Sequence, residues 1–195
     1  METMLDRILD RTREKTERIE LVDAQTSREQ GKKLRKKAAR SQQGAWEPAA
    51  DRPDPVTLLA SQNETRIPEL LPLRSQRMAA SAFAFYRGSA LIMASDLANT
   101  PRTGLTVQCC GDAHVSNFGF FKTPEQHMTF DINDFDETLP GPWEWDVKRL
   151  AASIEICGRD CGMTLGDRER AVLGTVASYR EAMAQFAQMG AMKVW

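Results

Sequence analysis

The sequence predicts an α+β fold that is mostly helical and contains one small antiparallel β-hairpin. In the second half, apolar residues recur at three- and four-residue steps, which is typical of amphipathic helices. Two short strand-like runs, 118–121 and 128–132, flank a turn at 122–127, which is typical of a hairpin. With 195 residues, of which 42% are hydrophobic, the chain is long enough to bury a core.

Residues 1–45 are rich in charge and are predicted to form a partly disordered leader. Within it, Leu5, Ile8 and Leu9 indicate a short amphipathic helix. Seven basic side chains cluster in the second part of this leader: Arg28, Lys32, Lys33, Arg35, Lys36, Lys37 and Arg40. A phosphate- or nucleic-acid-binding arm is one interpretation of this cluster. No aromatic residue interleaves it, so a solvated leader is favoured over a base-stacking surface.

Residues 46–55 are predicted to be a linker, because three prolines in ten residues prevent a regular helix or a central strand. The remaining 56–195 are predicted to form the folded domain. Before the hairpin, it is expected to contain helical stretches at 56–66 and 75–98, a turn at 99–104 and a short buried strand at 105–110.

Two longer helices are predicted after the hairpin, at 145–161 and 165–189. Their apolar stripes are interpreted as core faces. The stripe of the first helix contains Val147, Leu150, Ala151 and Ile154, and that of the second contains Val172, Val176, Tyr179, Met183 and Phe186.

Composition limits the classes of function. The net charge of -1 argues against nucleic-acid binding by bulk electrostatics. The sequence contains no run of 18 apolar residues, so no membrane span is predicted. Its first residues contain no apolar signal-peptide core, so a cytoplasmic location is expected. The four cysteines match no zinc-binding spacing and are interpreted mainly as buried thiols in a reducing compartment.

The segment from Gly111 to Asn117, followed by Asn133-Asp134-Phe135-Asp136, has the spacing of a phosphoryl-transfer centre. In this interpretation Asp112 orients a substrate hydroxyl, while Asn117 and Asp134 hold Mg²⁺. An antiparallel hairpin returns the chain to within about 5 Å of its start, so Asn117 and Asp134 are expected to converge beside the Asp112 loop.

Several other carboxylates are expected to crowd this region, and a bound metal would compensate their repulsion. They are Asp131, Asp136, Glu137, Glu144 and Asp146. His114 has two interpretations. It could shape the loop by hydrogen bonding, or it could ligate a metal, and the structural role is favoured because its neighbours are mostly oxygen ligands.

The order Gly-Asp-x-His-x-x-Asn, hairpin, then Asp-aromatic-acid resembles the catalytic core of the aminoglycoside phosphotransferase and choline kinase branch of kinase-like proteins. In that branch another Asp follows the metal-binding Asp by twelve residues and braces the catalytic loop. Asp146 stands at this offset from Asp134, which selects Asp134 rather than Asp131 as the metal ligand. The resemblance implies a core like a kinase C-terminal lobe, with Mg²⁺ and with ATP as co-substrate.

A closer resemblance covers the chain from about Gly31 to its end. The strings 83–88, 111–119 and 130–153 are similar to a bacterial family called domain of unknown function 2252. Members of that family are longer, and their glycine-rich and lysine-bearing segments follow this region. The resemblance therefore implies an incomplete domain that lacks the phosphate-gripping parts of a kinase. A natural fragment would expose apolar surface that the missing C-terminal half covers.

The function expected from these patterns is ATP- and Mg²⁺-dependent phosphoryl transfer to a hydroxyl of a small molecule or a protein. Arg87 could contact a phosphate through a bidentate guanidinium, or it could be an ordinary ion-pair partner. Two alternatives remain open. One is a non-catalytic nucleotide- or metal-binding module, because no glycine-rich loop and strand lysine are present. The other is a divalent-metal phosphohydrolase, which needs neither.

Overall fold

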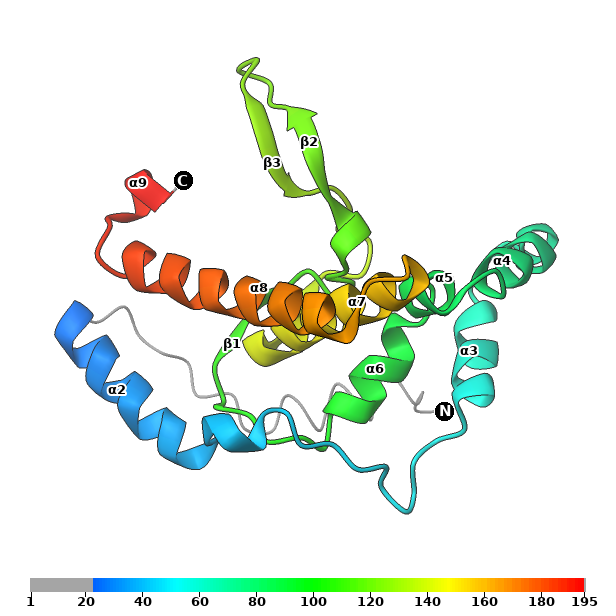
Figure 1. The fold of residues 1–195 in the computed structure, drawn as a ribbon, viewed down its shortest axis with the longest axis horizontal. Coiled ribbons are helices and arrows are strands. Elements are labelled where there is room, and N and C mark those ends of the chain that lie inside the picture. The colour runs from blue at the N-terminus through cyan, green and yellow to red at the C-terminus, as the bar shows by residue number, and fades with distance from the viewer. Residues whose placement is uncertain (1–22, 195) are drawn as a thin grey trace.

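A computed structural model describes residues 23–194 and confirms the α+β class, with helices dominating and only short antiparallel strand pairs (Figure 1). The residues Leu5, Ile8 and Leu9 of the expected leader helix lie outside the described part. The longer helices are α2 (Ala24–Lys37), α3 (Pro55–Asn63), α4 (Leu71–Met78), α6 (Ala90–Leu97), α7 (Trp143–Asp160) and α8 (Leu165–Phe186). Shorter helices are α5 (Ala82–Arg87), α9 (Ala191–Val194), η1 (Arg40–Gln42), η2 (Pro68–Leu70) and η3 (Val115–Asn117).

The predicted hairpin is confirmed. Strands β2 (Phe118–Lys122) and β3 (Met128–Ile132) pair antiparallel, with Phe118 opposite Ile132 and Lys122 opposite Met128. The hairpin projects from the helical body (Figure 1). Its Phe120 and Phe130 rings form a cross-strand pair with centroids 4.9 Å apart. Both rings are exposed, so the hairpin tip presents an apolar surface rather than a buried core.

The strand predicted before Gly111 is present as β1 (Thr106–Cys109), but its surroundings differ from the expectation. Only Cys109 of this strand is buried, so the expectation of a buried strand was wrong for most of it. The partner is β4 (Leu139–Pro142), which was not predicted. Two prolines in its four residues hide β4 in the sequence, and such residues are tolerated here because the sheet has only two strands, each with a free edge.

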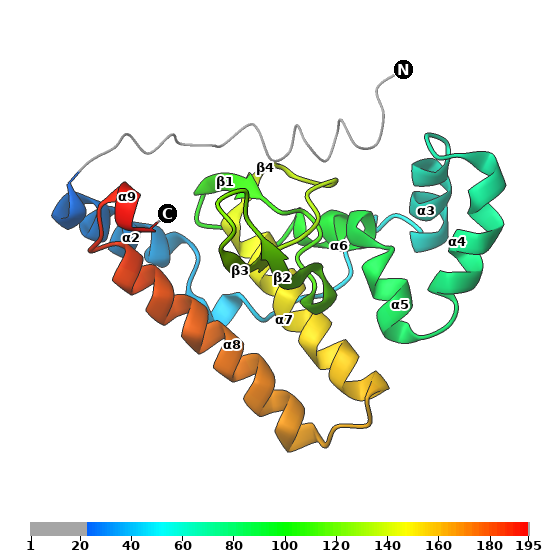
Figure 2. The ribbon, with the colours of Figure 1, turned by 90° about the horizontal axis from the view of Figure 1, so that it is seen from above.

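The stretch 75–98, expected as continuous helical pattern, is divided among α4, α5 and α6. The first break lies at Ser81, whose hydroxyl accepts a hydrogen bond from the backbone nitrogen of Ala84 at 3.1 Å and caps α5. The second lies at Gly88, which ends α5. After these breaks, α5 and α6 pack against α7, whereas α4 packs against α5 and lies farther out (Figure 2).

The two long helices lie close to the predicted positions and form an antiparallel pair joined by a tight turn (Figure 2). Gly162 in this turn has a φ of 71°, and Thr164 caps α8 by accepting a hydrogen bond from the backbone nitrogen of Asp167 at 3.2 Å. None of the helices within 23–194 is both long and apolar enough to cross a lipid bilayer.

The interpretation of the apolar stripes as core faces holds only in part for α7 and is wrong for most of α8. On α7 the predicted stripe is only half-buried, and the most buried side chains are Glu144, Arg149 and Ser153. On α8 most of the stripe, from Val176 to Phe186, is exposed. The α7 result has a physical reason, since this helix packs against a loop whose backbone groups need polar partners.

Most of the basic run lies in α2, where its lysines and arginines are exposed. The Asp23 carboxylate begins the helix by accepting hydrogen bonds from the backbone nitrogens of Gln25 at 2.9 Å and Thr26 at 3.0 Å. Basic residues in the last turn suit the negative end of the helix dipole. The expected linker between α2 and α3 is irregular up to Pro55, the first residue of α3.

Candidate functional site

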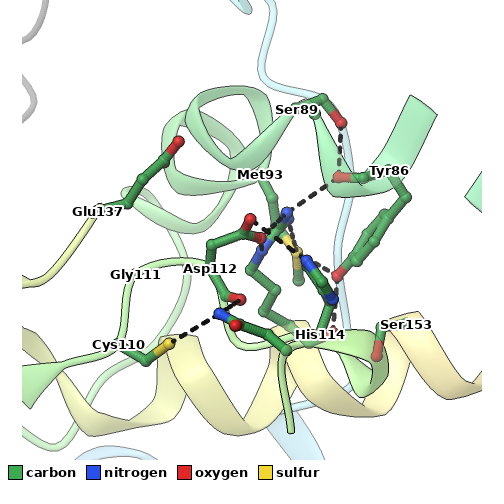
Figure 3. Close-up of polar contacts among 12 residues, drawn as sticks. Tyr86, Ser89, Met93, Cys110, Gly111, Asp112, His114, Glu137 and Ser153 are labelled. Carbon is green, nitrogen blue, oxygen red and sulfur yellow. Dashed lines mark hydrogen bonds and ion pairs between the residues drawn. The ribbon is translucent and has the colours of Figure 1, made fainter. Parts of the chain in front are cut away.

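The loop from Cys110 to Val115 is held by one polar face of α7. Asp146, Arg149 and Ser153 share this face because they stand three and four residues apart. The Asp146 carboxylate accepts hydrogen bonds from the backbone nitrogens of Cys110 at 2.7 Å and Gly111 at 3.1 Å. Ser153, which is fully buried, accepts one from the backbone nitrogen of Val115 at 3.0 Å. Figure 3 shows the loop above this helix.

Gly111 allows the loop to pass close to a neighbouring segment. Its φ is 83°, in the left-handed region that favours glycine. A Cβ atom at this position would lie 2.0 Å from the backbone carbonyl oxygen of Glu137. Both the conformation and the contact therefore require glycine directly before Asp112.

Asp112 is anchored by two cationic or proton-donating side chains (Figure 3). Its Oδ1 accepts hydrogen bonds from Nε and Nη2 of Arg149, the former at 2.8 Å, and its Oδ2 lies 3.4 Å from Nε2 of His114. Burial alone would raise the pKa of Asp112. The hydrogen bond with His114 and the charge of Arg149 outweigh burial, so the pKa of Asp112 lies below its ordinary value. Asp112 is therefore a fixed carboxylate at neutral pH.

Arg149 is the main residue that the sequence interpretation missed. Its side chain is only 3% exposed, and its Nη2 also donates to the backbone carbonyl of Tyr86 at 2.9 Å. The guanidinium lies 4.4 Å from the centre of the Tyr86 ring, and the Tyr86 hydroxyl donates back to the Arg149 carbonyl at 2.7 Å. Burial raises the pKa of Tyr86 to about 12, so this phenol stays protonated.

His114 lies inside the same cluster and is buried. Its ring meets Phe83 edge-on, with centroids 6.2 Å apart. Its Nδ1 is buried without a hydrogen-bond partner among the described residues. These contacts fit the expected role of shaping the loop around Asp112, and that role stays a prediction.

Asn117 joins the two halves of the motif. Its side chain is buried, and its amide nitrogen donates to the backbone carbonyls of Asp112 at 3.2 Å and Asp134 at 3.1 Å. The backbone carbonyl of Asn117 also accepts from the Asn133 nitrogen at 2.9 Å, which extends the hairpin ladder by one step. The convergence expected from the hairpin is present. The same nitrogen also contacts Sγ of Cys110 at 3.7 Å, so all these side-chain bonds use the nitrogen and leave the amide oxygen available to a ligand.

Asp134 lies at the open side of this arrangement and is exposed. Its Oδ1 accepts a hydrogen bond from the backbone nitrogen of Asp136 at 3.1 Å, a local turn that fixes the carboxylate direction. It lines the same cavity as Asp112 and His114. Its role as a metal ligand stays a prediction.

The expected crowding of carboxylates is present only in part. It holds for Glu137, because burial and the nearby charge of Asp112 raise the pKa of this carboxyl. Glu144 points elsewhere and accepts hydrogen bonds from the backbone nitrogen and the hydroxyl of Thr103, both at 2.7 Å. Asp146 is used by the loop backbone, and Asp131 and Asp136 are exposed. Within residues 23–194 no three His, Cys, Asp or Glu side chains gather to hold a metal ion. A magnesium site made by Asn117 and Asp134 would have only two protein ligands, so phosphate oxygens and water would complete its coordination.

The four cysteines are free thiols, two of them buried next to the loop. Burial raises the pKa of Cys109 to about 12, which keeps this thiol protonated and unreactive. Cys109 and Cys110 agree with the interpretation as small buried side chains, whereas Cys157 is half-buried and Cys161 is exposed.

A cavity of about 820 Å³ opens beside Asp112, His114 and Asp134. Four arginines contribute to its lining, namely Arg66, Arg74, Arg77 and Arg87. Of these, only Arg87 was singled out from the sequence. The others were overlooked because no recognisable motif contains them: Arg74 and Arg77 lie on the short helix α4, and Arg66 lies in the connection between α3 and η2.

Comparison with protein families gives one match. A family model described as an uncharacterised protein conserved in bacteria, domain of unknown function 2252, matches residues 66–195. The chain belongs to this family. The match begins at residue 66, later than the expected start near Gly31. No curated protein and no solved structure matches the chain.

The domain of unknown function 2252 region contains the whole candidate site. The cavity arginines, the Asp112 loop, the hairpin and α7 all fall within the matched residues, whereas α2 and α3 precede them. The family description names no reaction. Chemistry for this site must therefore be argued from its own side chains.

Proposed function

We propose that this chain carries the hydroxyl-orienting and magnesium-binding part of a kinase-like phosphotransfer site. Asp112 orients the acceptor hydroxyl, while the amide oxygen of Asn117 and the carboxylate of Asp134 hold Mg²⁺ bound to the phosphates of ATP. Asp146, Arg149 and His114 are positioning residues that hold Asp112 in place. The acceptor is a hydroxyl on a small molecule or a protein.

The observation that carries this proposal is the double hydrogen bond of the Asn117 amide nitrogen. It donates to the backbone carbonyls of both Asp112 and Asp134, at 3.2 and 3.1 Å. In-line phosphoryl transfer needs a fixed relation between the group that orients the hydroxyl and the group that holds the metal. One buried side chain supplies that relation here, and the two residues that it links, Asp112 and Asp134, both line a cavity large enough for a ligand.

The electrostatics of Asp112 fit an orienting role better than strong proton abstraction. Its lowered pKa makes it a weak base at neutral pH. The transition state of phosphoryl transfer is loose, so positioning and charge stabilisation contribute more than a strong base. Because Arg149 and His114 fix the orientation of the Asp112 carboxylate, it can accept a hydrogen bond from a substrate hydroxyl without first reorienting.

The residues present suit magnesium. Mg²⁺ prefers hard oxygen ligands and usually takes only one or two protein carboxylates, with phosphates and water completing six positions. Asp134 uses Oδ1 to accept from the Asp136 backbone, and its Oδ2 is open to a ligand. When bound, Mg²⁺ would neutralise charge on the transferred phosphate.

Replacement of Asp134 tests the metal assignment. We expect Asp134→Asn to abolish Mg²⁺-dependent binding of a non-hydrolysable ATP analogue, because the neutral amide loses the charge that attracts the cation. The fold should persist, since Asp134 is exposed and its Asx turn can be retained by asparagine. Isothermal titration calorimetry measures the affinity, and circular dichroism checks the fold.

Asp131→Asn is the matched control, because Asp131 is an exposed aspartate on the same hairpin. It should bind the Mg²⁺ complex as tightly as the parent chain. Equal affinity in the Asp134→Asn and parent proteins would reject the metal assignment. Binding of Mg²⁺ and nucleotide without transfer to any hydroxyl would favour a binding module, and Mg²⁺-dependent cleavage of phosphate esters without ATP would favour a phosphohydrolase.

A further inference from the structure

We infer that Arg66, Arg74, Arg77 and Arg87 form a binding subsite for the phosphate chain of the substrate, in the cavity that also contains Asp112 and Asp134. The inference rests on the proposed function for the identity of the reaction, although the subsite itself requires only a phosphate-bearing ligand. It assigns a site to four arginines, three of which no motif indicated.

The arginines come from elements that pack into one wall. Arg66 precedes η2, Arg74 and Arg77 belong to α4, and Arg87 ends α5. The Nη2 atom of Arg74 donates to the backbone carbonyl of Gly88 at 2.7 Å and so links α4 to the end of α5. This link fixes the spacing between the two helices that carry the arginines.

Gly88 permits close packing of the same wall. A Cβ atom on Gly88 would lie 2.7 Å from the sulfur of Met78, which is buried at the end of α4. The absence of a side chain lets Met78 fill the space between α4 and α5. The arginines therefore project from a packed support rather than from a mobile loop.

The charge of the cavity lining is strongly unbalanced. Four guanidinium groups line it, against the carboxylates of Asp112 and Asp134 only. Asp112 is already neutralised by Arg149, which does not line this cavity. Outside the lining, Oε1 of Glu137 lies 4.0 Å from Nη2 of Arg66, which is the upper distance limit for an ion pair. The lining therefore carries a net positive charge, which attracts anions into the cavity.

Two of the arginines keep all their donors for a ligand. Within residues 23–194, the side chains of Arg77 and Arg87 make no hydrogen bond or ion pair. Arg52, in contrast, donates two hydrogen bonds to the carboxylate of Asp96. The pKa of Arg74 is lowered, chiefly by burial and next by the charge of Arg66. This repulsion between neighbouring cations is what a bound phosphate would relieve.

The ligand class follows from guanidinium chemistry. Arginine recognises phosphate through paired, parallel hydrogen bonds, and several arginines around one cavity suit a chain of phosphates better than a single carboxylate. The cavity volume of about 820 Å³ falls within the range of small-molecule sites. A nucleoside triphosphate and an inorganic polyphosphate share this chemistry.

The double variant Arg77→Gln, Arg87→Gln tests the subsite. Both side chains are exposed and form no described polar contact, so their loss should leave the fold intact. We expect the affinity for tripolyphosphate without Mg²⁺, measured by isothermal titration calorimetry at low salt, to fall about tenfold. Arg180→Gln is the matched control, since Arg180 is exposed on α8 and does not line the cavity. Unchanged affinity in the double variant, an equal loss in the control, or no binding by the parent chain would each overturn the subsite.

Two further arms separate this inference from the proposed function. Tighter binding of ATP than of tripolyphosphate, lost in the double variant, would identify a nucleotide ligand, and equal affinities would support a polyphosphate group alone.

Asp134→Asn should retain tripolyphosphate binding without Mg²⁺. If it does so while the parent chain shows no Mg²⁺-dependent ATP binding, the arginine subsite stands and the kinase-like function fails. If Mg²⁺-dependent ATP binding survives in the double variant at full affinity, the subsite fails and the function stands.

Discussion

Substitution of Gly111 by alanine is expected to destabilise the chain by about 3 kcal/mol or more, because two separate costs add. A non-glycine residue at a φ of 83° carries strain on the order of 1–2 kcal/mol. The new methyl group would also lie 2.0 Å from the backbone carbonyl oxygen of Glu137, so one of the two segments must move. Urea unfolding followed by circular dichroism measures the loss.

Gly162→Ala separates the two costs. Gly162 also has a positive φ, of 71°, but a Cβ atom there would meet nothing within 4 Å. This control should lose only about 1 kcal/mol, from backbone strain alone. Equal destabilisation by both substitutions would show that contact between the Gly111 loop and Glu137 contributes nothing.

Arg149→Met is expected to cost about 2–3 kcal/mol of folding free energy. The substitution leaves the Asp112 carboxylate and the Tyr86 carbonyl without their buried cationic partner. The figure is below that for a fully buried pair because the Asp112 side chain is 20% exposed and gains some solvation. Urea unfolding at neutral pH gives the size of the loss.

The difference between parent and Arg149→Met should shrink in acid. The pKa of Asp112 is lowered in the folded state, so its pairing stabilises the fold above the ordinary aspartate range and this stability is lost as pH falls through the folded pKa. Arg159→Met is the control, since Arg159 is exposed and its pair with Glu155 at 2.7 Å should contribute less than about 1 kcal/mol. A gap between parent and Arg149→Met that is independent of pH would contradict pairing with Asp112.

The hairpin and the meeting of Asn117 with Asp134 could be predicted because both depend on short-range sequence. Turn residues between two short strand-like runs specify an antiparallel return, and the return brings the two ends of the hairpin together. Likewise, α7 and α8 begin and end near their predicted limits because long periodic segments carry strong signals.

The parts that could not be predicted depend on long-range contacts. Arg149 pairs with Asp112 across 37 positions of the chain, and β1 pairs with β4 although two prolines obscure the second strand. One signal was present for the first of these. Asp146, Arg149 and Ser153 form a polar stripe on one face of α7, and a polar stripe that faces the interior indicates a backbone segment in need of partners.

The stripe on α8 misled the interpretation for a different reason. Periodicity identifies a helix and its apolar side, but it does not say what covers that side. Residues such as Met183 and Phe186 remain exposed here, like the aromatic rings at the hairpin. The arginine cavity was missed because four separate positions of the chain converge only after folding.

The central claim is that Asn117 and Asp134 hold a divalent metal beside Asp112. Mn²⁺ can replace Mg²⁺ at oxygen-rich sites, and it broadens the nuclear magnetic resonance signals of nearby backbone amides. Titration of Mn²⁺ with a non-hydrolysable ATP analogue into the ¹⁵N-labelled chain is therefore the most direct test. We predict early and selective broadening of the amides at 111–117 and 133–136. Broadening elsewhere with these amides unaffected, or no selective broadening at all, would contradict the claim.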